Sequence, residues 1–583
     1  GLLLSMVRHQ VPQLVNFGPK YSAIIGATWN GRDLDRRFLT GLEMPVWDSV
    51  AAALTGQFTD AVLDRAIAAL PGEVRTLDGA RLRSGLVARR DGLQRMARDY
   101  YRLLAREVEV VASDRADVAT VERRDGGLVM VSVRQRDRAT PYFERVFRAA
   151  ETSDIRLYLH GGADSAIVTG GAGGATVRVI GGGGDDQFIN RSTGPTKFYD
   201  DRGQNAAEGG SIDTRSYQAI DDTTNPTALP HRDWGRRTLP FPAASLGPDV
   251  GFVLGYGATT TSWGFRKKPV ASTISYQAVV ATGGPTGRAK VAARFQAENS
   301  SRYFSFLVMG SGIEVVRWHG FGNDRLISDT LPVAYYRANQ HQLVVAPSVG
   351  WTLGDRVLLE AGPRFKYAVT ELDDGVNAER FIGADRPFGT SGIAQLGGGF
   401  ELEFDSRDTP AAARRGVLVE AGGAVYPAVL DIKRGFGELH GRVATYLSPA
   451  MPFRPTLALQ AGAKKVFGAK GRIPFYEAAF LGSGSTLRGF RSQRFAGDGS
   501  VFGSAELRLE LSRATLLVPG GQGGFGFYDG GRVFLEDESS STWHQSFGGG
   551  VWLSFLTPGT LLAAALGTSD EGSRLHLRAG FAF

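Results

Sequence analysis

Two short motifs near the end of the chain carry side chains of opposite charge that could bind each other. One is the tetrad LRGF at 487–490, with Arg488 between apolar neighbours, and the other is FYDGG at 527–531, which contains Asp529. Arginine keeps its charge and offers a planar fork of donors that a carboxylate can accept with both oxygens. Arg488 could therefore bind Asp529. The alternative is a solvated loop arginine and an aspartate that only shapes a turn.

No catalytic pattern accompanies this pair. The sequence contains no HExxH, no Walker phosphate loop and no GxSxG nucleophile elbow. It has no cysteine, so zinc cannot bind through thiolates. His160 with Asp164 and His231 with Asp233 are isolated pairs that surface hydrogen bonding explains more simply. We therefore expect no active site in this chain.

The two motifs, followed by a strand that ends on Phe583, resemble the BamA/TamA-type surface-antigen (outer-membrane protein 85) superfamily, two-partner-secretion transporters included. The resemblance covers roughly residues 245–583. The lead-in Ile473–Thr486 also resembles this family, although a Gly-Gly often found before the tip reads Gly482-Ser483. The resemblance implies a 16-stranded outer-membrane barrel whose sixth extracellular loop folds into the lumen. Carried over by position, the loop tip is Leu487, Arg488, Gly489 and Phe490, and the strand partner motif is Phe527, Asp529 and Gly531, with Arg488 expected to pair with Asp529.

The terminal strand alternates in character from one residue to the next. One face would carry Leu575, Leu577, Ala579, Phe581 and Phe583, and the other His576, Arg578, Gly580 and Ala582. A period of two with one apolar face predicts a half-buried strand. Aromatic residues at its end suit a membrane interface, so we expect Phe581 and Phe583 to form a C-terminal barrel signal there.

The same alternation recurs from about residue 249, for example over 250–258, 357–369 and 506–511. A transmembrane barrel needs apolar residues outside and polar residues inside. A globular sandwich would show the same alternation with its apolar face inward. Long charges and glycines on the polar face, and segments of about ten residues, favour the barrel. We place the barrel at 240–583, and note that Pro363 within a strand gives up a ladder bond.

The first 110 residues read as mainly helical. Asp33 and Asp35 lie beside three arginines, where they could bind a metal, but we expect them to mark a helix start. Further helices are expected to begin near Asp48 and near Thr59 or Asp60. A long helix should follow Asp78-Gly79, because apolar residues recur there at helical spacing.

Residues 111–235 are strand-rich and then glycine-rich. Three short strands over 107–135 fit a connector or, alternatively, a periplasmic POTRA domain, and 156–189 resembles rungs of a parallel β-helix. The stretch GGGGDDQFI at 181–189 fits the calcium-binding nonapeptide repeat once. Asp185 and Asp186 are therefore weak calcium candidates, with plain turn chemistry as the alternative, and no other cofactor is expected. Asp200 and Asp201 are further calcium candidates. A linker rich in prolines precedes the barrel: Pro226, Pro230, Pro240, Pro242 and Pro248.

The composition limits the number of domains, the class of partner and the cellular compartment that we expect. The 583 residues are too many for one ordinary domain, and the net charge of +7 without a basic helix gives no sign of nucleic-acid binding. The absence of cysteine fits an oxidising envelope compartment. No run of apolar residues is long enough for a transmembrane helix. We expect a bacterial outer-membrane protein that contacts lipid, lipopolysaccharide and client or envelope proteins, with its N-terminal part in the periplasm.

The region before the barrel also resembles the C-terminal part of long bacterial envelope proteins. WNGRDLDRRFL at 29–39 and VIGGGGDDQF at 179–188 carry this resemblance. Those proteins join a metallophosphoesterase-like and a kinase-like domain to a surface-antigen barrel, so the resemblance implies that this chain is a processed or C-terminal piece. Neither GDxxD nor GNHD occurs in it. We therefore expect a mainly β protein, with a helical region, a β-helix-like domain and a barrel, that inserts or translocates polypeptides. The alternatives are a membrane anchor and exit pore for an upstream hydrolase domain, or a structural subunit.

Overall fold

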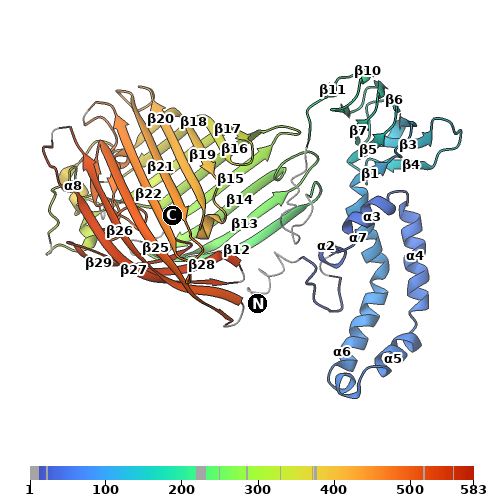
Figure 1. Cartoon of the computed structure of the whole chain (residues 1–583), viewed down its shortest axis with the longest axis horizontal. Helices are drawn as coiled ribbons and strands as arrows, with labels where there is room; N and C mark the ends of the chain where they lie inside the picture. Colours follow the sequence, from blue (N-terminus) through green and yellow to red (C-terminus); the bar gives the residue numbers. More distant parts are fainter. Residues whose placement is uncertain are drawn as a thin grey trace. The chain divides into compact units, whose positions relative to one another are not determined.

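The computed structural model describes residues 12–583 except 22–23, 218–231, 248–249, 284–285, 329, 371, 373–376, 470, 516–518, 537 and 556. The chain divides into two compact units, Gly1–Ala219 and Ile220–Phe583, which Figure 1 shows in the colours of the sequence. Pro226, Pro230 and Pro248 of the predicted linker lie outside the described residues.

Unit 1 begins with helices. They are α2 (Ile24–Ala27), α3 (Arg32–Phe38), α4 (Met44–Gln57), α5 (Asp60–Ala68), α6 (Gly72–Asp91) and α7 (Leu93–Ala105). Thr59 caps α5 by accepting a hydrogen bond from the Val62 N–H, as expected for a threonine before a helix. The other two predicted starts are wrong. Asp48 lies inside α4, where it pairs with Arg98 of α7 at 2.7 Å, and α6 begins at Gly72 and runs through Asp78-Gly79.

The helices α4 and α7 form the core of this region. Trp47 meets the ring of Tyr100 edge-on at 5.6 Å, and Ala51 and Ala97 are buried. Asp33 and Asp35 lie in the first turn of α3, where Asp35 accepts a hydrogen bond from the Tyr100 hydroxyl. None of the helices that the structure describes is long and apolar enough to cross a membrane.

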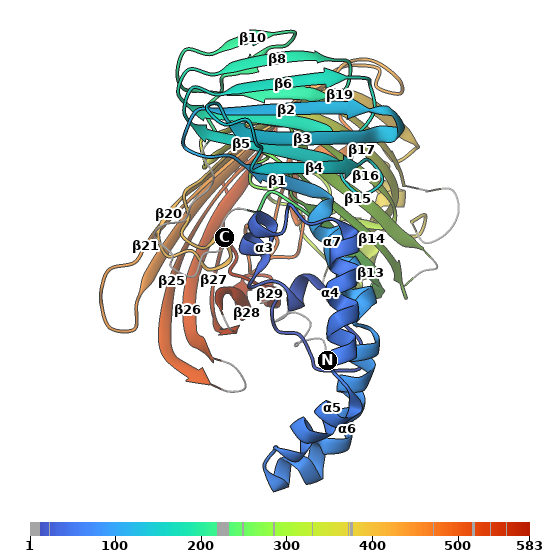
Figure 2. The same ribbon diagram turned by 90° about the vertical axis from the view of Figure 1, so that its right-hand side faces the viewer.

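The rest of unit 1 is a parallel β-helix of two sheets (Figure 2). Its strands are β1 (Glu107–Val111), β2 (Asp117–Arg124), β3 (Leu128–Gln135), β4 (Phe143–Arg148), β5 (Asp154–Gly161), β6 (Ser165–Gly170), β7 (Thr176–Gly183), β8 (Gln187–Ser192), β9 (Thr196–Tyr199), β10 (Ala206–Glu208) and β11 (Ile212–Asp213). One sheet has the order β1-β5-β7-β9-β11 and the other β10-β8-β6-β2-β3-β4. The strands β1 and β2 pair in parallel with β5 and β6 and belong to the β-helix, whereas β3 and β4 extend its second sheet by antiparallel pairing. Residues 107–135 therefore form neither a separate connector nor a POTRA domain. Valines and other apolar side chains fill the space between the sheets.

Unit 2 is a 16-stranded antiparallel sheet that curves into a barrel (Figure 1). Its strands in order are β12 (Arg236–Gly247), β13 (Gly251–Ser262), β14 (Ser272–Ala281), β15 (Gly287–Gln296), β16 (Arg302–Arg317), β17 (Arg337–Leu353), β18 (Val357–Val369), β19 (Ile393–Asp405), β20 (Gly416–Tyr426), β21 (Phe436–Leu447), β22 (Thr456–Phe467), β25 (Gly499–Thr515), β26 (Pro519–Phe534), β27 (His544–Phe555), β28 (Thr557–Ser569) and β29 (Gly572–Ala579). Its first strand starts at Arg236, so Pro240 and Pro242 lie within the barrel and not in a linker.

Apolar side chains of the barrel point outward. Phe252, Leu254 and Tyr256 alternate along β13 and are each at least half exposed, while Glu506 and Arg508 of β25 are buried inside. A sandwich would bury the apolar set instead. This distribution confirms the barrel interpretation of the alternating pattern.

Candidate functional site in the barrel lumen

A long loop between β22 and β25 folds back into the barrel. It carries a short hairpin of β23 (Ala479–Leu481) and β24 (Phe495–Gly497), and the LRGF tetrad lies between these two strands. Leu487 is fully buried and packs with Phe490, Phe495 and Val533 in one apolar cluster. This cluster fixes the tip of the loop against the barrel wall.

Arg488 and Asp529 lie together, both almost completely buried. The guanidinium donates from Nη2 to Asp529 Oδ1 at 2.6 Å and from Nε to Oδ2 at 3.0 Å, and the Arg488 N–H also donates to Oδ2 at 3.0 Å. The Ser546 hydroxyl donates to the same carboxylate at 3.1 Å. The guanidinium carbon lies 3.5 Å from the centre of the Phe527 ring, a cation–π arrangement. The structure therefore brings Arg488, Phe527 and Asp529 of the two motifs into one contact.

Sequence reasoning missed the next two members of this network. The second Nη of Arg488 donates to Glu506, which is 1% exposed, and Arg508 donates from Nε to the other Glu506 oxygen at 2.7 Å. Arg508 also donates to the main-chain oxygen of Phe583 at 2.9 Å. Asp529, Arg488, Glu506 and Arg508 thus form a buried row of alternating charges, here called the charge row. Alternation already put Glu506 and Arg508 on the polar face of their strand, and that was the available signal.

Close approach explains the glycines of both motifs. A Cβ on Gly489 would lie 2.7 Å from Ser546 Cβ and from the Thr568 carbonyl carbon, and one on Gly531 would lie 2.8 Å from the Val501 oxygen. A side chain at Gly489 would push the loop tip off the wall, and one at Gly531 would collide with the backbone of the paired strand β25. The tip also bonds to the last strands, since His576 contacts the Arg488 oxygen at 2.7 Å.

The end of the chain differs from the prediction. The strand β29 ends at Ala579, and Gly580, with φ of 82°, turns the last residues into the barrel. Leu575 and Leu577 face outward at 68% and 74% exposure, whereas Phe583 is only 7% exposed. Phe583 packs in one cluster with residues of β20, β21 and β22: Leu418, Ala444, Tyr446 and Ala458. The Phe581 ring also lies inside, with the guanidinium carbon of Arg508 4.0 Å from its centre, so neither phenylalanine lies on the outer face.

The first and last strands are neighbours in a closed barrel, yet no backbone ladder joins β12 to β29 among the described residues. The strand β12 has 12 residues and β29 has 8. Prolines are tolerated on edge strands, where the missing N–H faces no partner. Pro240 and Pro242 lie two residues apart in β12, where the backbone N–H groups of alternate residues point toward the same edge of the strand. Because proline has no N–H, both residues remove a hydrogen-bond donor from that one edge. We call the boundary between β12 and β29 the seam.

The weak calcium candidates lie at a corner of the β-helix. Asp185 Oδ1 accepts a hydrogen bond from the Gln204 N–H, and Asp186 Oδ1 accepts one from the Asp164 N–H, both at 2.8 Å. Among the residues with described positions, no group of three or more histidines or carboxylates is placed to hold a metal ion. These hydrogen bonds join successive coils of the β-helix.

No protein-family model and no curated protein match the chain. Solved structures do match it. BamA from Haemophilus ducreyi lacking POTRA domains 1–3 is 11% identical, with a TM-score of 0.41. The match covers 62% of this chain and 73% of the BamA chain. CdiB from Escherichia coli is 12% identical, with a TM-score of 0.40, and covers 60% of this chain and 62% of its own. CdiB from Acinetobacter baumannii is 10% identical, with a TM-score of 0.36, and the match covers 59% of this chain and 60% of that CdiB chain. These similarities concern the barrel fold alone.

Proposed function

We propose that the chain is an outer-membrane barrel that inserts polypeptides into the outer membrane or moves them across it, and that the client strand enters at the seam. The unpaired seam carries this proposal. A strand edge with free N–H and C=O groups is a template on which another strand can pair. The apolar outer face suits lipid, and lipopolysaccharide is the expected neighbour in the outer leaflet. Unit 1 would then lie in the periplasm.

The charge row supports this function by keeping the loop in place while the seam changes. Its buried charges balance, and removing either inner member leaves an end member without its ion-pair partner: Asp529 without Arg488, or Arg508 without Glu506. A loop held in this way braces the last strands of the barrel, β25 to β29, beside the edge that would open. No step of the proposed function requires covalent chemistry from this chain.

A reversible lock of the seam tests the proposal. The chain has no cysteine of its own, so introduced pairs can be joined selectively. Ala244 of β12 and Leu577 of β29 are both exposed on the outer face, which makes Ala244→Cys with Leu577→Cys the seam pair. Ala244 lies directly opposite Leu254 in the β12–β13 ladder, so Ala244→Cys with Leu254→Cys is the matched control within paired strands.

A cleavable thiol cross-linker is applied to cells, and delivery of other proteins to the outer membrane is followed. We expect the seam lock to stop delivery, the reductant to restore it, and the control lock to have no effect. A complete seam lock without effect would overturn the proposal. The chain would then be better explained as an anchor and exit pore, or as a structural subunit, for a hydrolase domain upstream.

A further inference from the structure

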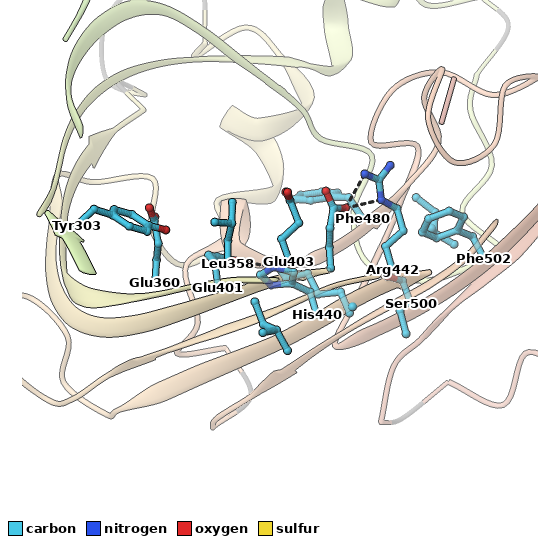
Figure 3. Close-up of a pocket in the computed structure, with 16 residues that line it drawn as sticks. Tyr303, Leu358, Glu360, Glu401, Glu403, His440, Arg442, Phe480, Ser500 and Phe502 are labelled. Carbon is cyan, nitrogen blue, oxygen red and sulfur yellow. Dashed lines mark hydrogen bonds and ion pairs between the residues drawn. The ribbon is translucent and has the colours of Figure 1, made fainter. Parts of the chain in front are cut away.

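Beside the β23 hairpin the barrel lumen holds a partly open pocket of about 650 Å³, here called the chamber. Figure 3 shows Tyr303 and Phe502 at its two ends, with glutamates between them. The carboxylates come from three neighbouring strands: Glu360 from β18, Glu401 and Glu403 from β19, and Glu420 from β20.

These glutamates lie opposite one another in the sheet. Glu360 pairs in register with Glu401, and Glu403 pairs in register with Glu420. Side chains of directly opposed residues share a face of the sheet and lie close together, so like charges there destabilise the pair. Two adjacent like-charge pairs on one wall therefore need nearby positive charge to offset their repulsion.

The protein supplies that charge to only one member of each pair. Arg364 binds Glu401 at 2.7 Å, with His440 at 3.2 Å on its other oxygen, and Arg442 Nε binds Glu420 at 2.6 Å. The remaining basic residue of the wall, Lys464, is held by Glu438 at 2.7 Å.

Glu360 and Glu403 form no ion pair among the residues whose positions are described. Glu360 accepts one weak hydrogen bond from Ser305 at 3.3 Å. The nearby Arg294 lies over the ring of Tyr303, with its guanidinium carbon 3.5 Å from the ring centre. The chamber therefore presents two carboxylates that the described wall does not neutralise.

An unsatisfied hydroxyl also faces the chamber. Tyr303 is 2% exposed and lines the chamber, yet its hydroxyl has no hydrogen-bond partner in the described structure. Burying a hydroxyl without a partner is unfavourable, so a ligand that bonds to it would gain affinity. The rings of Phe480 and Phe502 add apolar and aromatic surface to the same space.

We propose that this chamber binds an alkylammonium or guanidinium group, which contacts Glu360 and Glu403 beside the Tyr303 hydroxyl and packs on the rings of Phe480 and Phe502. Such a group carries the missing positive charge, and its methylenes and flat face pack on aromatic rings. It can belong to a free organic cation or to a basic side chain of a polypeptide. The first source does not depend on the proposed function, and the second would deepen it.

Calorimetric titration of the full chain in detergent micelles tests this site. The probes are spermidine, for a free organic cation, and an unstructured arginine-containing peptide, with its citrulline counterpart as the uncharged control. We expect at least one cationic probe to bind, and the citrulline peptide not to. Glu403→Gln should weaken binding about tenfold, the effect of one charge contact near a protein surface, and the addition of Glu360→Gln should weaken it further.

The matched control is Glu314→Gln, because Glu314 is a barrel glutamate that pairs with Arg288 outside the chamber. It should leave binding unchanged. Glu403→Gln should also raise the unfolding temperature of the ligand-free barrel, since it relieves a like-charge pair, and this shows that the variant folds. Binding of spermidine alone would identify a free cation, and binding of the peptide alone a polypeptide. Equal affinity in Glu403→Gln and the unmodified chain, or no binding of either probe, would overturn the proposal.

Discussion

Arg488 is the residue on which the luminal loop depends most. It holds Asp529 and Glu506, two carboxylates that are almost fully buried. Arg488→Ala would leave Asp529 without its cation, and breaking a buried ion pair in this way costs about 3–5 kcal/mol. We expect the folded barrel to convert to the unfolded form at a clearly lower temperature in semi-native electrophoresis. Arg434→Ala, which changes an exposed arginine, should leave that temperature unchanged.

Removal of both partners should be milder than the single changes predict. Arg488→Ala with Asp529→Ala leaves Glu506 and Arg508 paired with each other, so no buried charge is isolated. We expect the double variant to lose less stability than the sum of Arg488→Ala and Asp529→Ala, which is the signature of a direct interaction. Additive losses would mean that the two residues act independently.

The sequence made the pairing of Arg488 with Asp529 predictable, but not the rest of the charge row. Alternation assigned Glu506 and Arg508 to the lumen. Their contacts depend on the register of β25 against β26, which places Glu506 opposite Phe527 and beside the arginine. Register depends on pairing across the whole sheet, so it cannot be predicted from the spacing of residues along one strand. The fold of Phe583 into the barrel was missed for the same reason, because its partners are distant in sequence.

At the scale of elements, propensity located the helices and strands better than their ends. The strand β4 was missed, and α6 starts before the Asp78-Gly79 pair because helix packing overrides one glycine. The prediction that Pro363 gives up a hydrogen bond of the strand ladder agrees with the structure. The β17–β18 ladder has no registered pairs between Val345 and Val349, opposite this proline, while Pro363 still lies in register with Gly398 of β19.

The corner of the β-helix should make unit 1 sensitive to pH. Burial raises the pKa of Asp164 to about 6, and burial with the neighbouring Asp200 carboxyl raises that of Asp186 to about 7. The Asp117 N–H donates to Asp164 and lowers its pKa, and Arg136 lowers it too, whereas the charge of the Asp117 carboxylate raises it by less than that hydrogen bond lowers it. Because folding raises both pKa values, the folded state binds more protons than the unfolded state. The stabilisation is complete below pH about 4, the ordinary range of aspartate, and is lost as pH rises through 6 to 7.

Hydrogen exchange of β7 and β9, corrected for the chemical rate at each pH, measures this effect in the full chain. Protection should be greater at pH 5 than at pH 8. Asp186→Asn removes a titrating group but keeps the shape, so the variant should be more protected than the unmodified chain at pH 8, with a smaller difference between the two conditions. Equal pH dependence in both proteins would contradict the assignment to Asp186.

At the scale of the whole barrel, the last residues connect the seam to the opposite wall. The chain leaves the seam strand β29 at Ala579 and ends in the lumen, where the Phe583 ring packs against β20, β21 and β22. The hydrogen bond from Arg508 to Phe583 goes to the main-chain oxygen, so Phe583→Ala removes the ring and its contact with the Arg508 guanidinium but keeps this bond. Loss of a buried phenylalanine ring costs about 3–5 kcal/mol.

We therefore expect Phe583→Ala to lower the unfolding temperature of the barrel and to free β29 at its end. Cross-linking of Ala244→Cys to Leu577→Cys should then proceed at a different rate, because the position of β29 at the seam is less restricted. Phe467→Ala is the matched control, since Phe467 is 48% exposed on the outer face of β22 and lies in no buried cluster that the structure describes. If Phe583→Ala behaves like Phe467→Ala in both measurements, the tail does not hold the seam.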